Sequence, residues 1–189
     1  MKGRFVVVTG PSASGKSSLV DALLACTPNA SRLITITTRS PRPGERDGDH
    51  YHFVAREEFT ARLSKDEFFE HAEVYGNLYG SSKNVLAQLL ERFAYVFAVL
   101  DVQGAKTLKD KMPHTFIIFL HPGSIENITH RLMKERVGAP AEEIQKRIVT
   151  ATKELALADS FDVVVENKEG DFVNTLTNVK ALIGAQLTL

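Results

Sequence analysis

The sequence predicts an α/β fold in which a parallel, five-stranded sheet is flanked by helices. Short apolar runs rich in β-branched residues, each the length of a buried parallel strand, lie at residues 5–8, 33–36, 96–100, 116–120 and 163–165. Between these runs, apolar residues recur at the three- and four-residue spacing of helix faces. The expected faces are Leu19 and Leu23; Val85 and Leu89; Ile125, Ile128 and Leu132; Ile144, Ile148 and Leu155; and Val173, Leu176 and Val179. In such folds ligands bind at the carboxyl ends of the strands.

Two segments interrupt this alternation. Residues 38–81 contain half-exposed strand patterns at 51–54 and 69–74 around a short helix at 57–63, which predicts a small mixed α/β insertion. Residues 131–154 contain two helical patterns separated by Gly138 and Pro140, which predicts a mobile helical lid. We expect a single domain whose core comprises residues 1–37, 82–130 and 155–189.

Composition excludes several classes of protein. The 189 residues carry 23 basic and 23 acidic side chains, so we expect neither nucleic acid nor a membrane as a partner. A single cysteine, Cys26, cannot form an internal disulfide, and we expect it to be a small apolar residue on a helix face. No apolar run has the length of a membrane span or signal peptide, so we expect a cytoplasmic protein. The sequence does not distinguish a monomer from a homo-oligomer.

The segment GPSASGKS fits the pattern G-x-x-x-x-G-K-S/T, directly after a predicted strand and before a predicted helix. In this P-loop, glycines let backbone N–H groups turn inward toward phosphate, Lys16 reaches the β and γ phosphates, and the Ser17 hydroxyl binds Mg²⁺. The alternative is a glycine- and serine-rich turn with a solvated lysine. The residues expected to bind ATP here are Gly10, Ser12, Ala13, Ser14, Gly15, Lys16, Ser17 and Ser18.

Other features bear on the phosphate acceptor. No Asn-Lys-x-Asp segment of a switch GTPase is present, because the pair Asn167-Lys168 continues as Glu-Gly. A second group of cations, Arg39, Arg42 and Arg46, lies in TTRSPRPGERDGDHYHF. Arginine binds phosphate with two parallel hydrogen bonds, so this segment is a candidate anion site, although a solvated basic loop remains the alternative.

Three segments, TTRSPRPGERDGDHYHF, EFFEHAEVYGNLYGSSK and VLDVQGAK, follow the P-loop in an order that resembles the guanylate kinase family. The resemblance covers essentially the whole chain and implies a P-loop NTPase fold, with ATP and GMP as substrates, Mg²⁺ as cofactor, and 38–81 as the GMP-binding insertion. It implies that the GMP phosphate is held by Arg39, Arg42, Tyr51 and Tyr79, and that guanine is recognised by Thr35, Glu70 and Ser81, with Asp101 on the same side.

The chemistry of Glu70 supports this assignment independently. An ionised carboxylate accepts hydrogen bonds from N1–H and the exocyclic amine of guanine, whereas adenine would turn a lone pair toward it. Such a site can reject the wrong base by as much as about 10⁴- to 10⁵-fold. The alternative for Glu70 is a carboxylate on a strand surface, and the two tyrosines could be core aromatics with solvated hydroxyls.

By the same resemblance, Arg136 and Arg147 match the mobile-lid arginines, which with Lys16 and Arg42 would neutralise charge on the transferring phosphoryl group. Their alternative is an ion pair with Glu135 or Glu143. Asn167 resembles a residue near the adenine pocket. Asp101 could touch Mg²⁺ through water or have only a structural task with Arg39. Two positions before it, where the family usually has an acidic residue, the chain has Val99.

These features predict a nucleoside monophosphate kinase that converts ATP and GMP to ADP and GDP. Two alternatives remain: a non-catalytic guanylate kinase-like module that binds phosphopeptides, and a ribose 1,5-bisphosphate phosphokinase of the same fold. The intact P-loop disfavours the first, and Glu70 disfavours the second.

Overall fold

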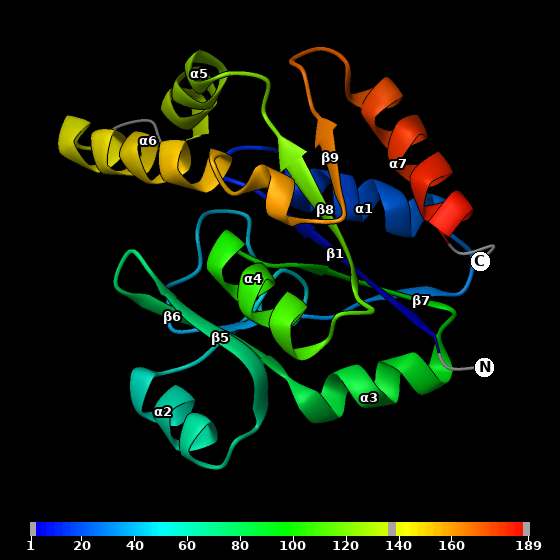
Figure 1. Cartoon of the computed structure of the whole chain (residues 1–189). Coiled ribbons are helices and arrows are strands. Elements are labelled where there is room, and N and C mark those ends of the chain that lie inside the picture. The colour runs from blue at the N-terminus through cyan, green and yellow to red at the C-terminus, as the bar shows by residue number, and fades with distance from the viewer. Residues whose placement is uncertain (1–2, 136–138, 187–189) are drawn as a thin grey trace. The chain divides into compact units, whose positions relative to one another are not determined.

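The computed structural model describes residues 3–135 and 139–186 (Figure 1). The chain divides into two compact units. Unit 1 comprises Met1–Val7 and Thr27–Phe116, and unit 2 comprises Val8–Cys26 and Ile117–Leu189. Among the described residues, no helix combines the length and the apolar character needed to cross a bilayer.

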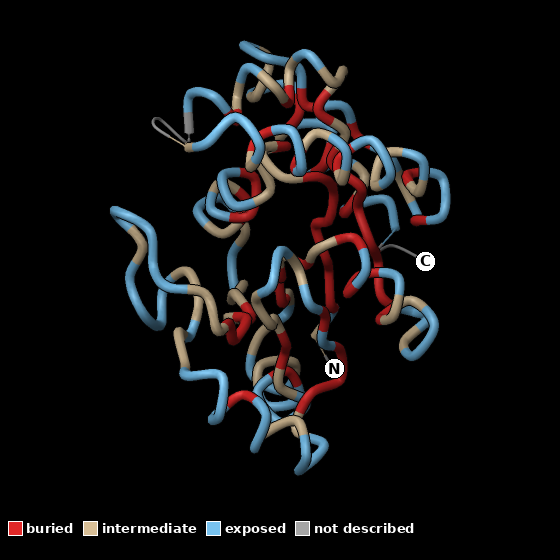
Figure 2. Tube along the Cα trace, turned by 90° about the vertical axis from the view of Figure 1, so that its left-hand side faces the viewer, coloured by how far each residue is buried: buried red, intermediate tan, exposed pale blue. Residues whose placement is uncertain are grey.

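The principal sheet has five strands in the order β2-β7-β1-β8-β9, and the division between the units passes through β1 and β8. The pairs β2–β7 and β8–β9 are parallel. Its strands are β1 (Arg4–Thr9), β2 (Ala30–Arg32), β7 (Tyr95–Val99), β8 (Phe116–His121) and β9 (Val163–Glu166). The predicted α/β class with a five-stranded parallel sheet is therefore confirmed, and β1, β7 and β8 are its most buried strands (Figure 2).

Unit 1 also contains a second, four-stranded sheet in the order β4-β3-β6-β5. It is mixed, because β3 pairs in parallel with β4 and antiparallel with β6. Its elements are β3 (Ile36–Thr37), β4 (His52–Phe53), α2 (Arg56–Ser64), β5 (Phe68–Val74) and β6 (Asn77–Ser82). Tyr75 and Gly76, both at positive φ, form the two-residue turn between β5 and β6, a backbone twist that suits a tight hairpin. Phe59 of α2 stacks on Phe68 with ring centroids 4.6 Å apart.

Two helices complete unit 1. α3 (Lys83–Arg92) is capped by Ser82, whose side chain accepts a hydrogen bond from the backbone N–H of Val85. α4 (Val102–Lys111) is capped by Asp101, which accepts from the N–H groups of Gln103 and Gly104 at 2.9 and 3.0 Å.

Unit 2 is mainly helical. Its helices are α1 (Lys16–Cys26), α5 (Ile125–Glu135), α6 (Ala141–Leu155), a short 3₁₀ turn (Ala158–Ser160) and α7 (Phe172–Gln186). α5 and α6 pack against each other through Ile128, Leu132, Ile144 and Ala151. α1 packs against α7.

Three expectations at the level of elements were wrong. The apolar run 33–36 is not a strand of the principal sheet: that strand is β2, and Leu33 to Thr35 connect it to β3. Val85 and Val173 do not belong to a core face, since they are 42% and 75% exposed. Cys26 is exposed, because it is the last residue of α1 and extends past the buried face formed by Leu19 and Leu23.

Candidate functional site

The P-loop lies in unit 2, between β1 and α1. Gly10 and Gly15 have φ of 135° and 94°, a region that L-residues rarely adopt. A Cβ on Gly10 would lie 2.5 Å from the Leu120 carbonyl oxygen, and one on Gly15 would lie 2.6 Å from Nδ2 of Asn167. Both positions therefore require glycine. The loop ends where α1 begins at Lys16, so the positive end of the helix dipole adds to its attraction for anions.

Lys16 folds back over this loop. Its Nζ donates to the carbonyl oxygens of Gly10 and Pro11 at 2.8 and 2.7 Å. Ser17 and Ser18, in the first turn of α1, are exposed, whereas Ser14 is fully buried. The ammonium group thus lies beside the loop that the motif predicts to hold phosphate, and the Ser17 hydroxyl is accessible at its end.

Asn167 braces the P-loop from the end of β9. Its side chain is buried, and its Nδ2 donates to the Ser14 carbonyl at 2.8 Å. The Thr175 hydroxyl lies 3.3 Å from its Oδ1 and 3.2 Å from the carbonyl oxygens of Glu166 and Asp171, so these three acceptors share one donor. Arg131 donates to the Asn167 carbonyl at 2.8 Å and lies 3.4 Å from the Ala13 carbonyl. Asn167 is therefore next to the predicted ATP-binding loop, where its amide holds the backbone of the loop.

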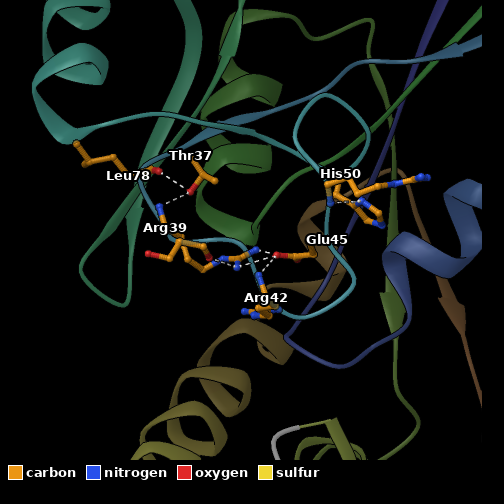
Figure 3. Close-up of polar contacts among 8 residues, drawn as sticks. Thr37, Arg39, Arg42, Glu45, His50 and Leu78 are labelled. Atoms are coloured by element: carbon orange, nitrogen blue, oxygen red, sulfur yellow. Dashed lines mark hydrogen bonds and ion pairs between the residues drawn. The ribbon is translucent and has the colours of Figure 1, made fainter.

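The arginine segment lies in unit 1, after β3. The two terminal nitrogens of Arg39 donate to the two carboxylate oxygens of Glu45 at 2.9 Å each, as Figure 3 shows. Glu45 also accepts from the backbone N–H of Arg42 at 2.8 Å, and Thr37 accepts from that of Arg39 at 3.2 Å. Burial alone would lower the pKa of Arg39, but the hydrogen bond and charge attraction of Glu45, together with contributions from Tyr79, raise that pKa overall. Burial alone would raise the pKa of Glu45, but the hydrogen bonds that Glu45 accepts from Arg39 and Arg42 lower that pKa overall.

Aromatic rings lie close to the guanidinium group of Arg39. The guanidinium carbon of Arg39 lies 5.3 Å from the ring centroid of Tyr51, and the rings of Tyr51 and Tyr79 meet edge to face at 6.0 Å. Burial raises the pKa of the Tyr51 hydroxyl. Arg42 is exposed beside them. The structure thus brings together Arg39, Tyr51 and Tyr79, whereas Arg46 is exposed and pairs with Asp49.

Glu70 is buried on β5, opposite Ser81 of β6, and only 1% of it is exposed. Neither carboxyl oxygen makes a hydrogen bond of acceptable geometry with any described residue. Burial raises the pKa of Glu70 to about 8 and the charge of Asp101 raises it too, while Ser81 and Lys111 lower it. Thr35 lies beside this group, with its hydroxyl 3.5 Å from that of Ser81. The alternative of a carboxylate on the strand surface is therefore excluded.

The structural task of Asp101 differs from the one expected: one of its oxygens caps α4, whereas the carboxylate that binds Arg39 is that of Glu45. Val99 ends β7 as a half-buried side chain. Asp101 is close enough to Glu70 for its charge to act on that carboxyl, and the chain has an apolar residue at 99.

Of the two arginines expected in the lid, only Arg147 lies within the described residues. Arg147 is 9% exposed, and its Nε and one terminal nitrogen bond to Glu143, one turn earlier in α6, at 3.1 and 3.0 Å. This is one of the two ion pairs that the sequence left open. Arg136 lies outside the described residues. The roles of both arginines at the phosphoryl group stay predictions.

Sequence reasoning missed two residues that organise these sites. Glu45 aligns Arg39, and its signal was a carboxylate three residues after Arg42, the first of three in a segment that we interpreted through its cations. Thr175 orients the Asn167 amide from α7, and nothing in the sequence pattern marks it among neighbouring polar residues.

Comparison with known proteins agrees with this arrangement. The sequence model of the family described as guanylate kinase matches residues 2–186. The chain is 40% identical over 187 residues to a guanylate kinase of Vibrio parahaemolyticus, covering 98% of this chain and 89% of that protein. It is also 40% identical over 188 residues to the guanylate kinase of Escherichia coli, with the same coverage.

A solved structure agrees as well. The crystal structure of guanylate kinase from Anaplasma phagocytophilum is similar with a TM-score of 0.78 at 29% identity, covering 98% of this chain and 86% of that one. With a whole-chain sequence match and this structural likeness, the chain belongs to the guanylate kinase family.

Proposed function

We propose that the chain transfers the γ-phosphoryl group of ATP to GMP, giving ADP and GDP, with ATP held by the P-loop of unit 2 and GMP by the pocket of unit 1. The observation that carries the assignment of GMP is the carboxyl group of Glu70, buried and without a hydrogen-bond partner among the described residues. Buried polar groups are almost always paired, so an unpaired carboxyl in a pocket is suited to a ligand with matching donors. Guanine offers two, N1–H and the exocyclic amine.

On the ATP side, the inward N–H groups of the loop and the start of α1 attract the phosphates. Lys16 would leave the carbonyls of Gly10 and Pro11 for the β and γ phosphates, exchanging two neutral acceptors for charged ones. The hydrogen bond from Asn167 to Ser14 keeps the loop in shape during this exchange.

On the GMP side, Arg39 is aligned by Glu45 and stacked near Tyr51, so its fork is held in one orientation. Arg42, exposed next to it, can add a second guanidinium to the GMP phosphate. Ser81 and Thr35 complete the surroundings of the base beside Glu70.

The chemical step needs positioning and charge neutralisation. An oxygen of the GMP phosphate attacks the γ-phosphorus, and the bond from that phosphorus to the bridging oxygen breaks, leaving ADP. No covalent bond to the protein is required. Lys16, Arg42, Arg136 and Arg147 would neutralise the charge that spreads over the transferring group.

The residues present fit a magnesium ion that is held chiefly by substrate. Among the described residues there is no group of three or more His, Cys, Asp or Glu side chains able to hold a metal. Mg²⁺ in kinases keeps several waters and binds substrate phosphates through few protein groups, and the exposed hydroxyl of Ser17 suits that role, with Asp101 as a candidate through water. When bound, the ion neutralises phosphate charge. A reaction on these nucleotides also suits the cytoplasm.

A coupled ADP-release assay with ATP and Mg²⁺ tests the proposal, with GMP, AMP and ribose 1,5-bisphosphate offered separately. We expect turnover with GMP, and a turnover with AMP that is lower by about 100-fold or more. Turnover of the sugar bisphosphate alone would support the sugar kinase, and no turnover with any acceptor would support the phosphopeptide module.

A further inference from the structure

Gly104 is a buried glycine in the first turn of α4, where a helix would be more stable with alanine. A Cβ built on it would lie 2.6 Å from Oε2 of Glu70 and 3.2 Å from Oδ2 of Asp101. Real Cβ atoms essentially never approach another heavy atom as closely as the first distance. The space left by the missing side chain is thus bordered by the two carboxyl groups of the base pocket.

We propose that Gly104 is a positioning residue for base recognition: its lack of a side chain allows the Glu70 carboxyl to reach the place from which it binds guanine. The inference rests on the proposed function, since it takes Glu70 as the group that reads the base. It adds a residue that touches neither substrate and still sets the KM for GMP and the preference for GMP over AMP.

The kind of atom that borders the space distinguishes this glycine from others in the chain. At Gly10 the nearest atom to an added Cβ is a backbone carbonyl oxygen, so a side chain there would push on the main chain. At Gly104 it is the end of a side chain that can rotate. An alanine at 104 would therefore leave the helix in place and move the carboxyl.

The Glu70 carboxyl can move only slightly before it leaves the position from which it would bind guanine. It is 1% exposed and pairs across the sheet with Ser81. The charged groups that act on it are Asp101 and Lys111, and the Lys111 ammonium donates to the Phe69 carbonyl at 3.0 Å. Rotation away from a Cβ at 104 would turn the carboxyl out of the geometry that two parallel hydrogen bonds to guanine require.

Gly104→Ala tests the proposal, and Gly184→Ala is the matched control. Gly184 is also helical, in α7, but a Cβ there would meet nothing within 4 Å. For Gly104→Ala we expect the KM for GMP to rise about 10-fold or more and the preference over AMP to fall. We expect the KM for ATP to stay within 2-fold and the melting temperature to be kept. A KM for GMP that is unchanged, or that rises equally in the control, would overturn the proposal.

A double-mutant cycle shows whether the effect passes through Glu70. In a Glu70→Ala background there is no carboxyl to displace, so adding Gly104→Ala should change kcat/KM for GMP by less than about 2-fold. The same loss in both backgrounds would contradict the proposal. If Gly104→Ala alone does not fold, a folded double variant with the melting temperature of Glu70→Ala supports the conflict between Cβ and carboxyl, and an unfolded one overturns it. Turnover of GMP by the unaltered chain tests the proposed function separately.

Discussion

The P-loop of unit 2 and the residues around Glu70 in unit 1, the proposed base pocket, differ in how their charged side chains are paired. In the P-loop, the ammonium of Lys16 and the amide of Asn167 bond to carbonyls of the loop itself. In the base pocket, both oxygens of Glu70 lack a partner among the described residues, and burial raises its pKa to about 8. The ammonium and amide groups at the P-loop are therefore paired with the loop, although the buried Ser14 hydroxyl has no partner among the described residues. The buried carboxyl of the proposed base pocket is left unpaired, at a cost in stability.

This difference explains what we expect substitutions to do. Changes in the P-loop should affect the phosphoryl transfer or ATP binding. Changes in the base pocket should affect GMP and its discrimination from AMP, and the loss of Glu70 should even stabilise the fold, because an unpaired buried carboxyl is costly.

The largest effect is expected for Lys16→Ala. The substitution removes a cation from the transferring phosphoryl group, so kcat should fall on the order of 10³-fold. The KM for GMP should stay within a few-fold, since the residue belongs to the ATP side. Steady-state kinetics with each substrate varied in turn checks both statements, and Lys180→Ala, an exposed lysine of α7, is the control. A large change in the KM for GMP with normal kcat would erase the distinction between the two sites.

Next in size is Glu70→Ala. Without the carboxylate, the preference for GMP over AMP should fall by about 10²-fold or more, because the site no longer rejects the base with the wrong lone pair. Glu73→Ala, an exposed carboxylate on the same strand, should leave the preference unchanged. The ratio of kcat/KM values for the two nucleotides measures this, and an unaltered ratio would remove Glu70 from base recognition.

Much of this contrast was visible in the sequence. Glycine spacing and the following lysine identify the P-loop, because those residue types are the chemical requirement of the site. The arginines and Glu70 were found through the order of three motifs. The burial of Glu70 was not foreseeable, because in a strand of alternating side chains only the packing of α4 against β5 decides which face is covered. For the same reason the run from Leu33 to Ile36 was predicted to be one strand of the principal sheet. Its apolar residues indicate burial, but here residues 33–35 connect β2 of one sheet to β3 of the other.

A smaller effect is expected from pH. The Glu70 carboxyl, with a pKa of about 8, is mostly protonated at neutral pH without ligand, whereas guanine binds the ionised form. Binding of GMP below pH 8 must therefore release a proton, and the apparent affinity should fall about tenfold for each pH unit below that value. Titrations between pH 6.5 and 9 measure the slope, which Glu70→Gln should abolish. A flat profile for the unaltered chain would show that the group is already ionised before GMP binds.

The same group makes a prediction for stability, with the opposite direction in pH. The pKa in the folded chain, about 8, lies above the ordinary value of 4.5, so the proton is bound more tightly in the folded state. Its contribution to the free energy of unfolding is full below about pH 4.5 and is lost as pH rises through about 8. Urea unfolding at pH 6 and pH 9 should thus show Glu70→Gln gaining stability relative to the unaltered chain as pH rises.

The smallest effect is expected for Thr175→Val, which tests the brace of the P-loop. Valine keeps the shape of threonine but has no hydroxyl to share among Oδ1 of Asn167 and the carbonyls of Glu166 and Asp171, so the amide that holds the Ser14 carbonyl loses one of its contacts. We expect the KM for ATP to rise by about 3- to 10-fold, consistent with a hydrogen bond worth about 1 kcal/mol, and the KM for GMP to stay constant. Thr177→Val, two residues further along α7 and exposed, is the control. If both variants behave alike, the loop holds its shape without Thr175, and its contacts with Lys16, Asn167 and Arg131 are sufficient.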